Sequence, residues 1–168
     1  MLEAHSPLDH VTGFEANGIS IVEEGGFQLC QYAGDDRILR KSFGKTPVKV
    51  GIALRHENRT LFRIAPRQIW VLGEDVPPAA GLYKTPLSSG RSRLQLSGPK
   101  ARGLLMACSA IDFHRSIFKP GHFVMTGVHH TPVTIHCISD QVFHIYVLRT
   151  CAQAVWEWVS DAAAGLGE

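Results

Sequence analysis

The sequence lacks the features of a membrane or secreted protein. No apolar run approaches the ~20 residues that a membrane-spanning helix needs, and residues 1–10 contain no Lys or Arg ahead of an apolar stretch, as a secretory signal would. The four cysteines are Cys30, Cys108, Cys137 and Cys151. They are far apart in the sequence, and none forms a C-x-x-C pair. Neither a disulfide framework nor a zinc ribbon is expected from this spacing. The sequence predicts a cytoplasmic protein without a membrane segment, with free and mostly buried thiols.

Fingerprints of cofactor binding and of covalent catalysis are absent as well. The sequence contains no G-x-G-x-x-G, no P-loop and no G-x-S-x-G, and Gly25-Gly26 comes before a predicted strand instead of after one. Cys137 is close in sequence to His136 and His144, but adjacent strand residues point to opposite faces of a sheet. We therefore expect no catalytic residues in this chain and no FAD, NAD or ATP site.

Histidine is concentrated in one part of the chain, and its spacing does not favour a metal site. Six of the nine histidines are His114, His122, His129, His130, His136 and His144. Neutral imidazole is a common metal ligand, but the sequence has no H-E-x-x-H and no histidine pair at i, i+4. We expect no bound metal, and strand histidines with hydrogen-bond partners, among which His136 and His144 can face each other across neighbouring strands.

Charge is unevenly distributed although the net charge is only +2. Residues 1–36 hold seven acidic residues and no Lys or Arg, whereas sixteen of the seventeen basic residues lie between Arg37 and Lys119. Two interpretations stay open: an acidic N-terminal arm that lies on a basic face of this chain or of a partner, and ordinary solvated surface. Nucleic-acid binding is not expected, because the basic residues are scattered among apolar strands.

The two halves of the chain are predicted to have the same order of strands and helix. The strands of the first half are expected at residues 27–33, 50–55, 60–65 and 68–72. A helix over residues 36–43 follows the first of them, with Asp35 as a plausible N-cap and Gly44 as its stop. Residues 56–59 have the composition of a turn. A loop rich in Pro and Gly at residues 73–89 separates the halves.

The second half repeats this order. Its strands are expected at residues 91–96, 122–128, 133–138 and 142–148. Ser97-Gly98-Pro99 begins its helix, with Pro99 at the first helical position. The sequence therefore predicts an α+β fold of two β-α-β-β-β halves, mainly antiparallel sheets with helices packed on one face.

A last helix is expected between Thr150, as its cap, and Gly165. Its apolar stripe is predicted to consist of Cys151, Ala154, Val155, Trp158, Val159 and Ala162. Trp156 falls off this stripe, and an exposed Trp is typical of an interface anchor. We therefore take Trp156 as the candidate interface residue.

Several segments resemble the sarcosine oxidase gamma-subunit family. The stretch 88–102, S-S-G-R-S-R-L-Q-L-S-G-P-K-A-R, is similar to the strand, S-G-P turn and helix at the centre of that family. The C-terminal run 148–159, L-R-T-C-A-Q-A-V-W-E-W-V, resembles its closing R-S-x-A-x-x-x-W-x-W-L pattern, with Thr150 in place of Ser and Val159 in place of Leu. Residues 110–114 and 118–121 fit its D-L and F-x-x-G spacing. The similarity covers about residues 85–163, with a looser match at 63–72.

The resemblance implies a reduced version of the tetrahydrofolate-binding aminomethyltransferase fold. It implies a small, non-catalytic structural subunit in a heterotetrameric oxidoreductase of sarcosine catabolism. The partners would be a larger alpha-type subunit, with beta and delta subunits in the same complex. FAD, FMN, NAD and tetrahydrofolate would be held by other subunits, which oxidise an N-methyl amine and pass its one-carbon unit to folate. Residues 18–168 would then form a single gamma-like domain, and the acidic N-terminal arm and first strand, residues 1–36, would be part of the same domain. Methylglutamate, dimethylglycine and sarcosine all remain possible substrates of such a complex.

Two other functions stay open. The first is a free-standing tetrahydrofolate-binding or aminomethyl-transfer protein, in which Arg91, Arg93 and Arg149 grip the glutamate carboxylates of folate, since the guanidinium fork suits paired hydrogen bonds to carboxylates. The family's folate-dependent iron–sulfur assembly relatives carry a K-G-C-Y-x-G-Q signature that is not found here. The second is a scaffold or assembly factor with no ligand.

Overall fold

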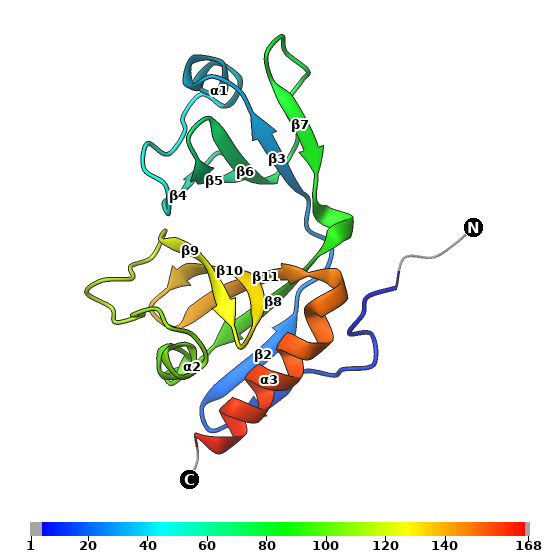
Figure 1. The fold of residues 1–168 in the computed structure, drawn as a ribbon, viewed down its shortest axis with the longest axis vertical. Helices are drawn as coiled ribbons and strands as arrows, with labels where there is room; N and C mark the ends of the chain where they lie inside the picture. The colour runs from blue at the N-terminus through cyan, green and yellow to red at the C-terminus, as the bar shows by residue number, and fades with distance from the viewer. Residues whose placement is uncertain (1–4, 167–168) are drawn as a thin grey trace. The chain divides into compact units, whose positions relative to one another are not determined.

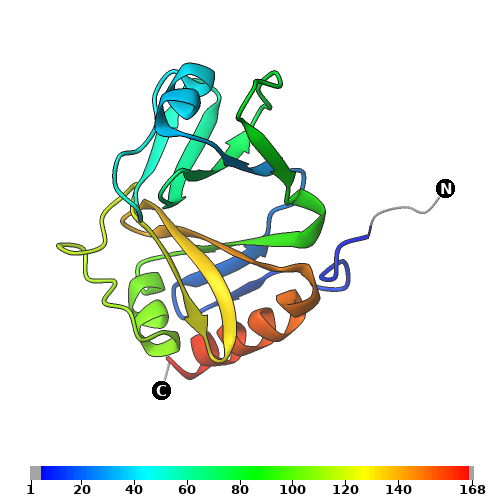
Figure 2. The same ribbon diagram turned by 45° about the horizontal axis from the view of Figure 1, so that its top comes forward.

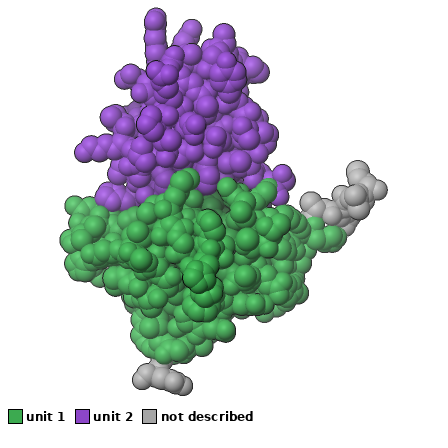
Figure 3. All heavy atoms as spheres, viewed as in Figure 1, with its two compact units in different colours: residues 1–25, 90–120, 124–168 green, residues 26–89, 121–123 purple. Residues whose placement is uncertain are grey.

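The computed structural model describes residues 5–166 and divides them into two compact units. Unit 1 comprises the described residues up to 25 together with 90–120 and those from 124 onward, and unit 2 comprises residues 26–89 and 121–123 (Figure 3). Each unit contains one antiparallel sheet. No helix in the described part of the chain is long and apolar enough to cross a membrane.

Unit 2 is built around a five-stranded sheet. Its elements are β3 (Leu29–Ala33), α1 (Asp36–Phe43), β4 (Ala53–His56), β5 (Arg59–Ala65), β6 (Gln68–Gly73) and β7 (Tyr83–Pro86). The strand order is β4-β5-β6-β3-β7 (Figure 1). Helix α1 turns Leu39 and Phe43 inward, where they join Tyr32, Leu61 and Ile69 in the core of this unit.

The ends of α1 follow the sequence. Asp35 is at the N-cap position, as predicted, although its side chain makes no capping hydrogen bond and pairs instead with Nε of Arg67 at 3.2 Å. Gly44 ends the helix with φ +70°, a conformation that suits a residue without Cβ. The helix therefore begins and ends where its sequence predicts.

Unit 1 contains a six-stranded sheet and two helices. Its elements are β1 (Phe14–Ala16), β2 (Ile19–Glu23), β8 (Arg91–Ser97), α2 (Ala101–Cys108), β9 (Phe123–Val128), β10 (Thr131–Ser139), β11 (Val142–Leu148) and α3 (Ala152–Gly165). Short 3₁₀ turns at Ser88–Gly90 and Arg149–Cys151 come before β8 and α3. The strand order is β1-β2-β8-β11-β10-β9.

Helices α2 and α3 lie side by side on one face of this sheet (Figure 2). Strand side chains alternate, so Leu94, Leu96 and Ile145 are fully buried in the same core as Leu104 of α2 and Val155 of α3. The opposite face of the sheet carries polar side chains, and its chemistry is described below.

The predicted duplication is confirmed by the topology. In unit 2 the order β3-α1-β4-β5-β6 gives the strand arrangement β4-β5-β6-β3, and in unit 1 the order β8-α2-β9-β10-β11 gives β9-β10-β11-β8. Each unit then extends its sheet beyond the first strand, by β7 in unit 2 and by β2 and β1 in unit 1. The α+β class with antiparallel sheets is likewise confirmed.

Several predicted boundaries are wrong. The strand expected from Val50 begins only at Ala53, after Gly51 adopts φ +85°. Pro99 comes before α2, which begins at Ala101. Thr150 does not cap α3, because residues 149–151 form a 3₁₀ turn ahead of the helix.

The segment predicted as an acidic N-terminal arm and first strand, residues 1–36, contributes strands to both units. Residues 14–23 form β1 and β2 of unit 1, and residues 26–36 belong to unit 2. Residues 1–4, which include Glu3 of the acidic stretch, lie outside the described residues. That residues 18–168 act as one gamma-like domain stays a prediction.

The S-G-P turn shows why glycine stands at its centre. Gly98 has φ +121°, and a Cβ there would lie 2.1 Å from the carbonyl oxygen of Gly18 in the β1–β2 turn. Its amide donates to the carbonyl of Gln141 at 2.9 Å. The turn is thus packed between two other turns, and only glycine fits.

Candidate functional site

The most concentrated polar chemistry of unit 1 lies on the sheet face opposite its helices. On β8 the alternation that buries Leu94 and Leu96 turns Arg91, Arg93 and Gln95 to this face. Residues from β10, β11 and the end of β2 join them. We call the following group the polar cluster: Glu24, Arg93, Gln95, His136, His144 and Tyr146.

Strand register brings these residues together. His144 of β11 faces His136 of β10 on one side and Gln95 of β8 on the other. Tyr146 is opposite Arg93 in the same way. The two imidazole rings lie 6.5 Å apart between centroids, so the predicted cross-strand histidine pair is confirmed.

Glu24 is the centre of charge in the polar cluster. Its Oε2 lies 3.0 Å from Nε of Arg93 and 3.2 Å from Nε2 of His144. The backbone fixes this arrangement, because the amide of Glu24 donates to the carbonyl of Arg93 at 2.8 Å. The guanidinium charge of Arg93 is therefore compensated within the unit.

Burial sets the protonation states of the cluster. Burial, with a smaller contribution from His144, lowers the pKa of His136 to about 4. Burial and then the charge of Arg93 lower the pKa of His144, against the opposing effect of Glu24. Burial raises the pKa of Tyr146 to about 12, while Arg93 opposes the rise. Both imidazoles are thus neutral and the phenol is protonated at neutral pH.

These states make the cluster a poor acid–base centre. A general acid or base works best when its pKa is near the working pH, and these three pKa values are all shifted away from it. Nε2 of His144 is close to two acceptors, Glu24 Oε2 and Gln95 Oε1 at 3.4 Å, so the neutral ring donates from this nitrogen. The end of β2, β8 and β11 are joined here by the ion pair of Glu24 with Arg93, by the contact of Glu24 with His144 and by the 3.4 Å hydrogen bond between His144 and Gln95.

The residues predicted to hold folate are only partly brought together. Arg91 and Arg93 share the polar face of β8, and Arg149 directly follows Leu148, the register partner of Arg91. Burial lowers the pKa of Arg91. Arg93 is already paired with Glu24. The folate role of these arginines stays a prediction.

The expected exposure of Trp156 is wrong. Trp156 is 7% exposed and belongs to the core of unit 1, whereas Trp158 is 44% exposed and stacks on His129 with ring centroids 3.9 Å apart. The buried residues of α3 are Ala152, Val155, Trp156, Val159, Ser160 and Ala163. This stripe shares two valines with the predicted one but is rotated around the helix, whose apolar residues extend beyond the buried side to Ala154, Trp158 and Ala162.

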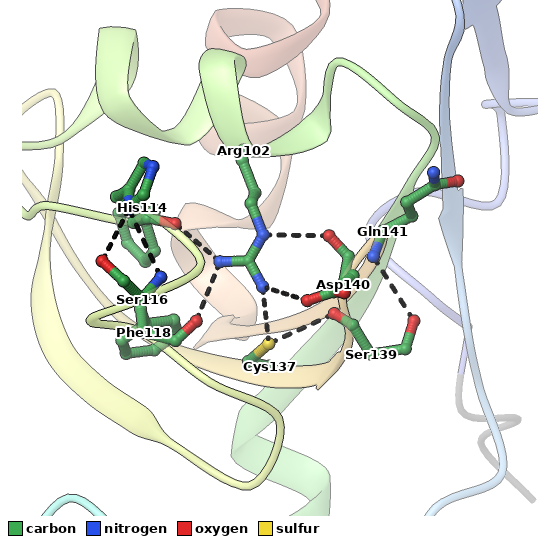
Figure 4. A network of polar contacts seen from close by, with 9 residues as sticks. Arg102, His114, Ser116, Phe118, Cys137, Ser139, Asp140 and Gln141 are labelled. Carbon is green, nitrogen blue, oxygen red and sulfur yellow. Dashed lines mark hydrogen bonds and ion pairs between the residues drawn. The ribbon is translucent and has the colours of Figure 1, made fainter.

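Arg102 of α2 is a structural residue that sequence reasoning missed. Its guanidinium points from the helix toward the end of β10 and the loop that follows α2 (Figure 4). It donates to the carbonyls of Phe113 at 2.6 Å, Phe118 at 2.8 Å and Asp140 at 2.9 Å. A second Asp140 contact is an ion pair at 3.3 Å. The available signal was an arginine within an otherwise apolar helix directly after the S-G-P turn.

A smaller polar group lies in unit 2. One carboxylate oxygen of Asp75 accepts from Tyr32 at 3.0 Å and from Cys30 at 3.4 Å, and the other oxygen pairs with Lys84. Burial, followed by the hydrogen bond to Asp75, raises the pKa of Cys30. The thiol is therefore protonated and unreactive at neutral pH, and the group ties β7 to β3.

The histidines do not converge on a metal centre. Within residues 5–166, no group of three or more His, Cys, Asp or Glu side chains has the arrangement of a metal site. His114, for example, bonds Ser116 through Nδ1 at 2.7 Å within its own loop. All four cysteines are free, with Cys30 and Cys137 buried and Cys108 and Cys151 partly so.

Known proteins resemble this chain in sequence and fold. The family described as "Sarcosine oxidase, gamma subunit family" matches residues 62–165. A chain of heterotetrameric sarcosine oxidase from Corynebacterium sp. U-96, solved in complex with pyrrole 2-carboxylate, superposes with a TM-score of 0.86 at 18% identity, covering 98% of this chain and 96% of that one. A search of the curated proteins finds no significant match.

A second solved structure shares the fold over a shorter part of its own length. Aminomethyltransferase T of the glycine cleavage system from Bartonella henselae superposes with a TM-score of 0.61 at 16% identity. The match covers 84% of this chain and 45% of that one. The chain is thus similar to less than half of that transferase.

Proposed function

The chain belongs to the sarcosine oxidase gamma-subunit family, and from this membership we propose that it is the small, non-catalytic structural subunit of a heteromeric, flavin-dependent oxidoreductase. The reaction of the complex is the oxidative demethylation of an N-methyl amine such as sarcosine. In this proposal the one-carbon unit passes to tetrahydrofolate on another subunit.

One observation carries the proposal: the superposition over nearly the whole of both chains with a chain of heterotetrameric sarcosine oxidase. The polar cluster supports a non-catalytic role, because its imidazoles are neutral and its one carboxylate is paired with Arg93. Glu24, Arg93 and His144 are thus engaged with one another inside the unit.

The proposed partners supply the chemistry. The alpha-type subunit is the direct partner, with beta and delta subunits in the same complex. FAD, FMN, NAD and tetrahydrofolate are bound by subunits other than this chain, and the assembly works in the cytoplasm. This chain contributes surface and rigidity to the assembly.

Co-purification tests the proposal directly. A tagged copy of this chain, expressed with the large flavoprotein subunit of the same source, is expected to elute with it as one species in size-exclusion chromatography. Flavin absorbance and sarcosine oxidation should follow the larger chain. The proposal is wrong if the chain elutes alone, or if the purified chain on its own carries flavin or oxidises the amine.

A free-standing folate protein is the second candidate, and the likeness of fold to aminomethyltransferase T favours it. In that case Arg91, Arg93 and Arg149 would bind the glutamate carboxylates of folate. Titration of the isolated chain with tetrahydrofolate separates the two functions, because only the second requires binding without a partner.

A further inference from the structure

The segment that connects α1 to β4 presents apolar side chains to solvent. Val48 is 91% exposed and Val50 is 57% exposed, and the lysines Lys45 and Lys49 beside them are exposed too. We call residues 45–50 the valine loop. The sequence predicts a strand that begins at Val50, in which alternate side chains would be buried. The exposure of Val50 therefore differs from what its sequence predicts.

One buried arginine of β5 holds the backbone on either side of residues 48–50. Arg63, 5% exposed, donates from Nε to the carbonyl of Pro47 at 2.9 Å, and Pro47 itself is buried. At the other end, the amide of Gly51 donates to the carbonyl of Arg63 at 3.1 Å. The guanidinium is held in turn by Asp36 at 2.7 Å.

This clamp gives the two valines a fixed position. Single exposed apolar residues are normal on a protein surface, but here a buried charge, which is costly to desolvate, is used to hold the loop. A surface loop that is already ordered loses little conformational entropy when a partner binds it. The loop therefore has the properties of a preformed projection.

The charge of the sequence on both sides of the valine loop indicates the kind of partner. Residues 37–56 contain six Lys or Arg and no Asp or Glu. Lys45 and Lys49 are exposed members of this basic segment. A surface that accepts the projection must offer an apolar depression for the valines and negative charge around it, because like charges across an interface are repelled.

We propose that the valine loop is a contact with the larger oxidase subunit, whose complementary surface is an apolar depression rimmed by carboxylates. This inference rests on the proposed function and adds to it the surface that this chain uses. Val48 and Val50 supply the buried apolar centre of the contact, and the lysines supply its polar rim.

Binding measurements on the intact chain and the large subunit test the inference. The double variant Val48→Ser/Val50→Ser is expected to bind at least about tenfold more weakly, which is ~1.4 kcal/mol, with an unchanged thermal midpoint. Met106→Ser is the matched control, because Met106 is 45% exposed on α2 of unit 1.

Lys49→Glu should slow association and reduce its salt dependence, while Lys119→Glu, outside the basic segment, should not.

The outcomes separate this inference from the proposed function. If the wild-type chain does not bind the large subunit, both are wrong. If it binds, and the double variant binds equally well, the valine loop is not the contact although the subunit role holds. If the double variant unfolds, hydrogen exchange of residues 45–50 in the wild-type complex decides, and unchanged exchange on binding overturns the inference. Loss of self-association in the double variant would instead assign the loop to a second copy of this chain.

Discussion

Arg102 illustrates how a single side chain can hold three segments of backbone. Its donors reach the carbonyls of Phe113 and Phe118, both within the loop that follows α2, and of Asp140 after β10. Its guanidinium also lies 5.1 Å from the ring centre of Phe143. Buried carbonyls that lose their donor bear the full penalty of desolvation.

Replacing Arg102 should therefore destabilise the fold. Arg102→Met keeps much of the side-chain volume but removes the donors, and we expect a loss of roughly 3–5 kcal/mol in the free energy of unfolding. Urea denaturation followed by circular dichroism measures it. Arg115→Met, on the exposed part of the same loop, is the control and should change stability by no more than about 0.5 kcal/mol. Equal losses of stability in the two variants would show that the hydrogen bonds of Arg102 do not stabilise the fold.

His136 links stability to pH. Its pKa is about 4 in the folded chain and 6.5 when exposed, so folding favours the neutral ring. Stability from this group is fully present above pH 6.5 and is lost as the pH falls toward 4, because protons then bind the unfolded chain more tightly. The full effect of a shift of this size is roughly 3 kcal/mol.

The variant His136→Gln removes this titration and should flatten the acid limb of the stability curve. Free energies of unfolding from urea titrations at pH 7.5 and 4.5 give the test, with the wild-type chain measured at both. Between pH 7.5 and pH 4.5 the wild type should lose more stability than the variant. The difference should be a large part of the roughly 3 kcal/mol that the full shift is worth. His144, whose pKa is also lowered, acts in the same direction. An identical loss in both proteins would mean that His136 does not titrate as its burial requires.

At the scale of elements, the sequence predicts the helix α3 correctly but predicts the wrong side of it to be buried. Both possible stripes recur at spacings of three and four, since the apolar residues of this helix cover an arc wider than one stripe. Only contact with the sheet distinguishes them, and it selects the face with Trp156. Tertiary packing, which the sequence of one helix does not contain, therefore determined which tryptophan is exposed.

The two tryptophans should respond differently to truncation. Trp156→Ala leaves a cavity in the core of unit 1 and should lower the free energy of unfolding by about 3–5 kcal/mol. Trp158→Ala removes only the stacking on His129 and should cost about 1 kcal/mol or less. Thermal unfolding of the two variants side by side measures the difference. A reversed order would place Trp158, not Trp156, in the core.

Other elements differ in how far the sequence specifies them. The strands β5, β6 and β11 were predicted within one residue, because alternation and the turn at residues 56–59 mark their ends. The hairpin of β1 and β2 was missed although Asn17-Gly18, both at positive φ, is a strong hairpin signal. Strand β7 has every residue exposed and no alternation, so nothing local to it predicts pairing with β3.

At the scale of the whole molecule, the repeated order of elements was the most informative feature. It predicted two equivalent strand arrangements, which the sheets of units 1 and 2 confirm. The polar cluster could be predicted only in part: the register of β10 and β11 follows from alternation and pairs His136 with His144. The approach of Glu24 to Arg93 depends on β2 pairing with β8 across a long stretch of sequence, which no local pattern contains.

The last prediction concerns folate and the isolated chain. Of the three arginines proposed to bind it, Arg93 already compensates Glu24 at 3.0 Å, so binding a folate carboxylate there requires the loss of an existing ion pair. Arg91 pays a desolvation penalty already, as its lowered pKa shows. We therefore expect tetrahydrofolate to bind the lone chain with a dissociation constant above roughly 1 mM, or about 4 kcal/mol of binding free energy at most.

Isothermal calorimetry of the purified chain under reducing conditions measures this affinity, and Arg91→Ala and Arg149→Ala test the residues. Glu24→Gln is an informative companion, because it releases Arg93 from its carboxylate partner and should strengthen any folate binding that uses this arginine. Heat signals indistinguishable from dilution for the wild type agree with a subunit that leaves folate to a larger partner. Micromolar binding that disappears in either alanine variant would contradict it, and would favour a chain that handles folate by itself.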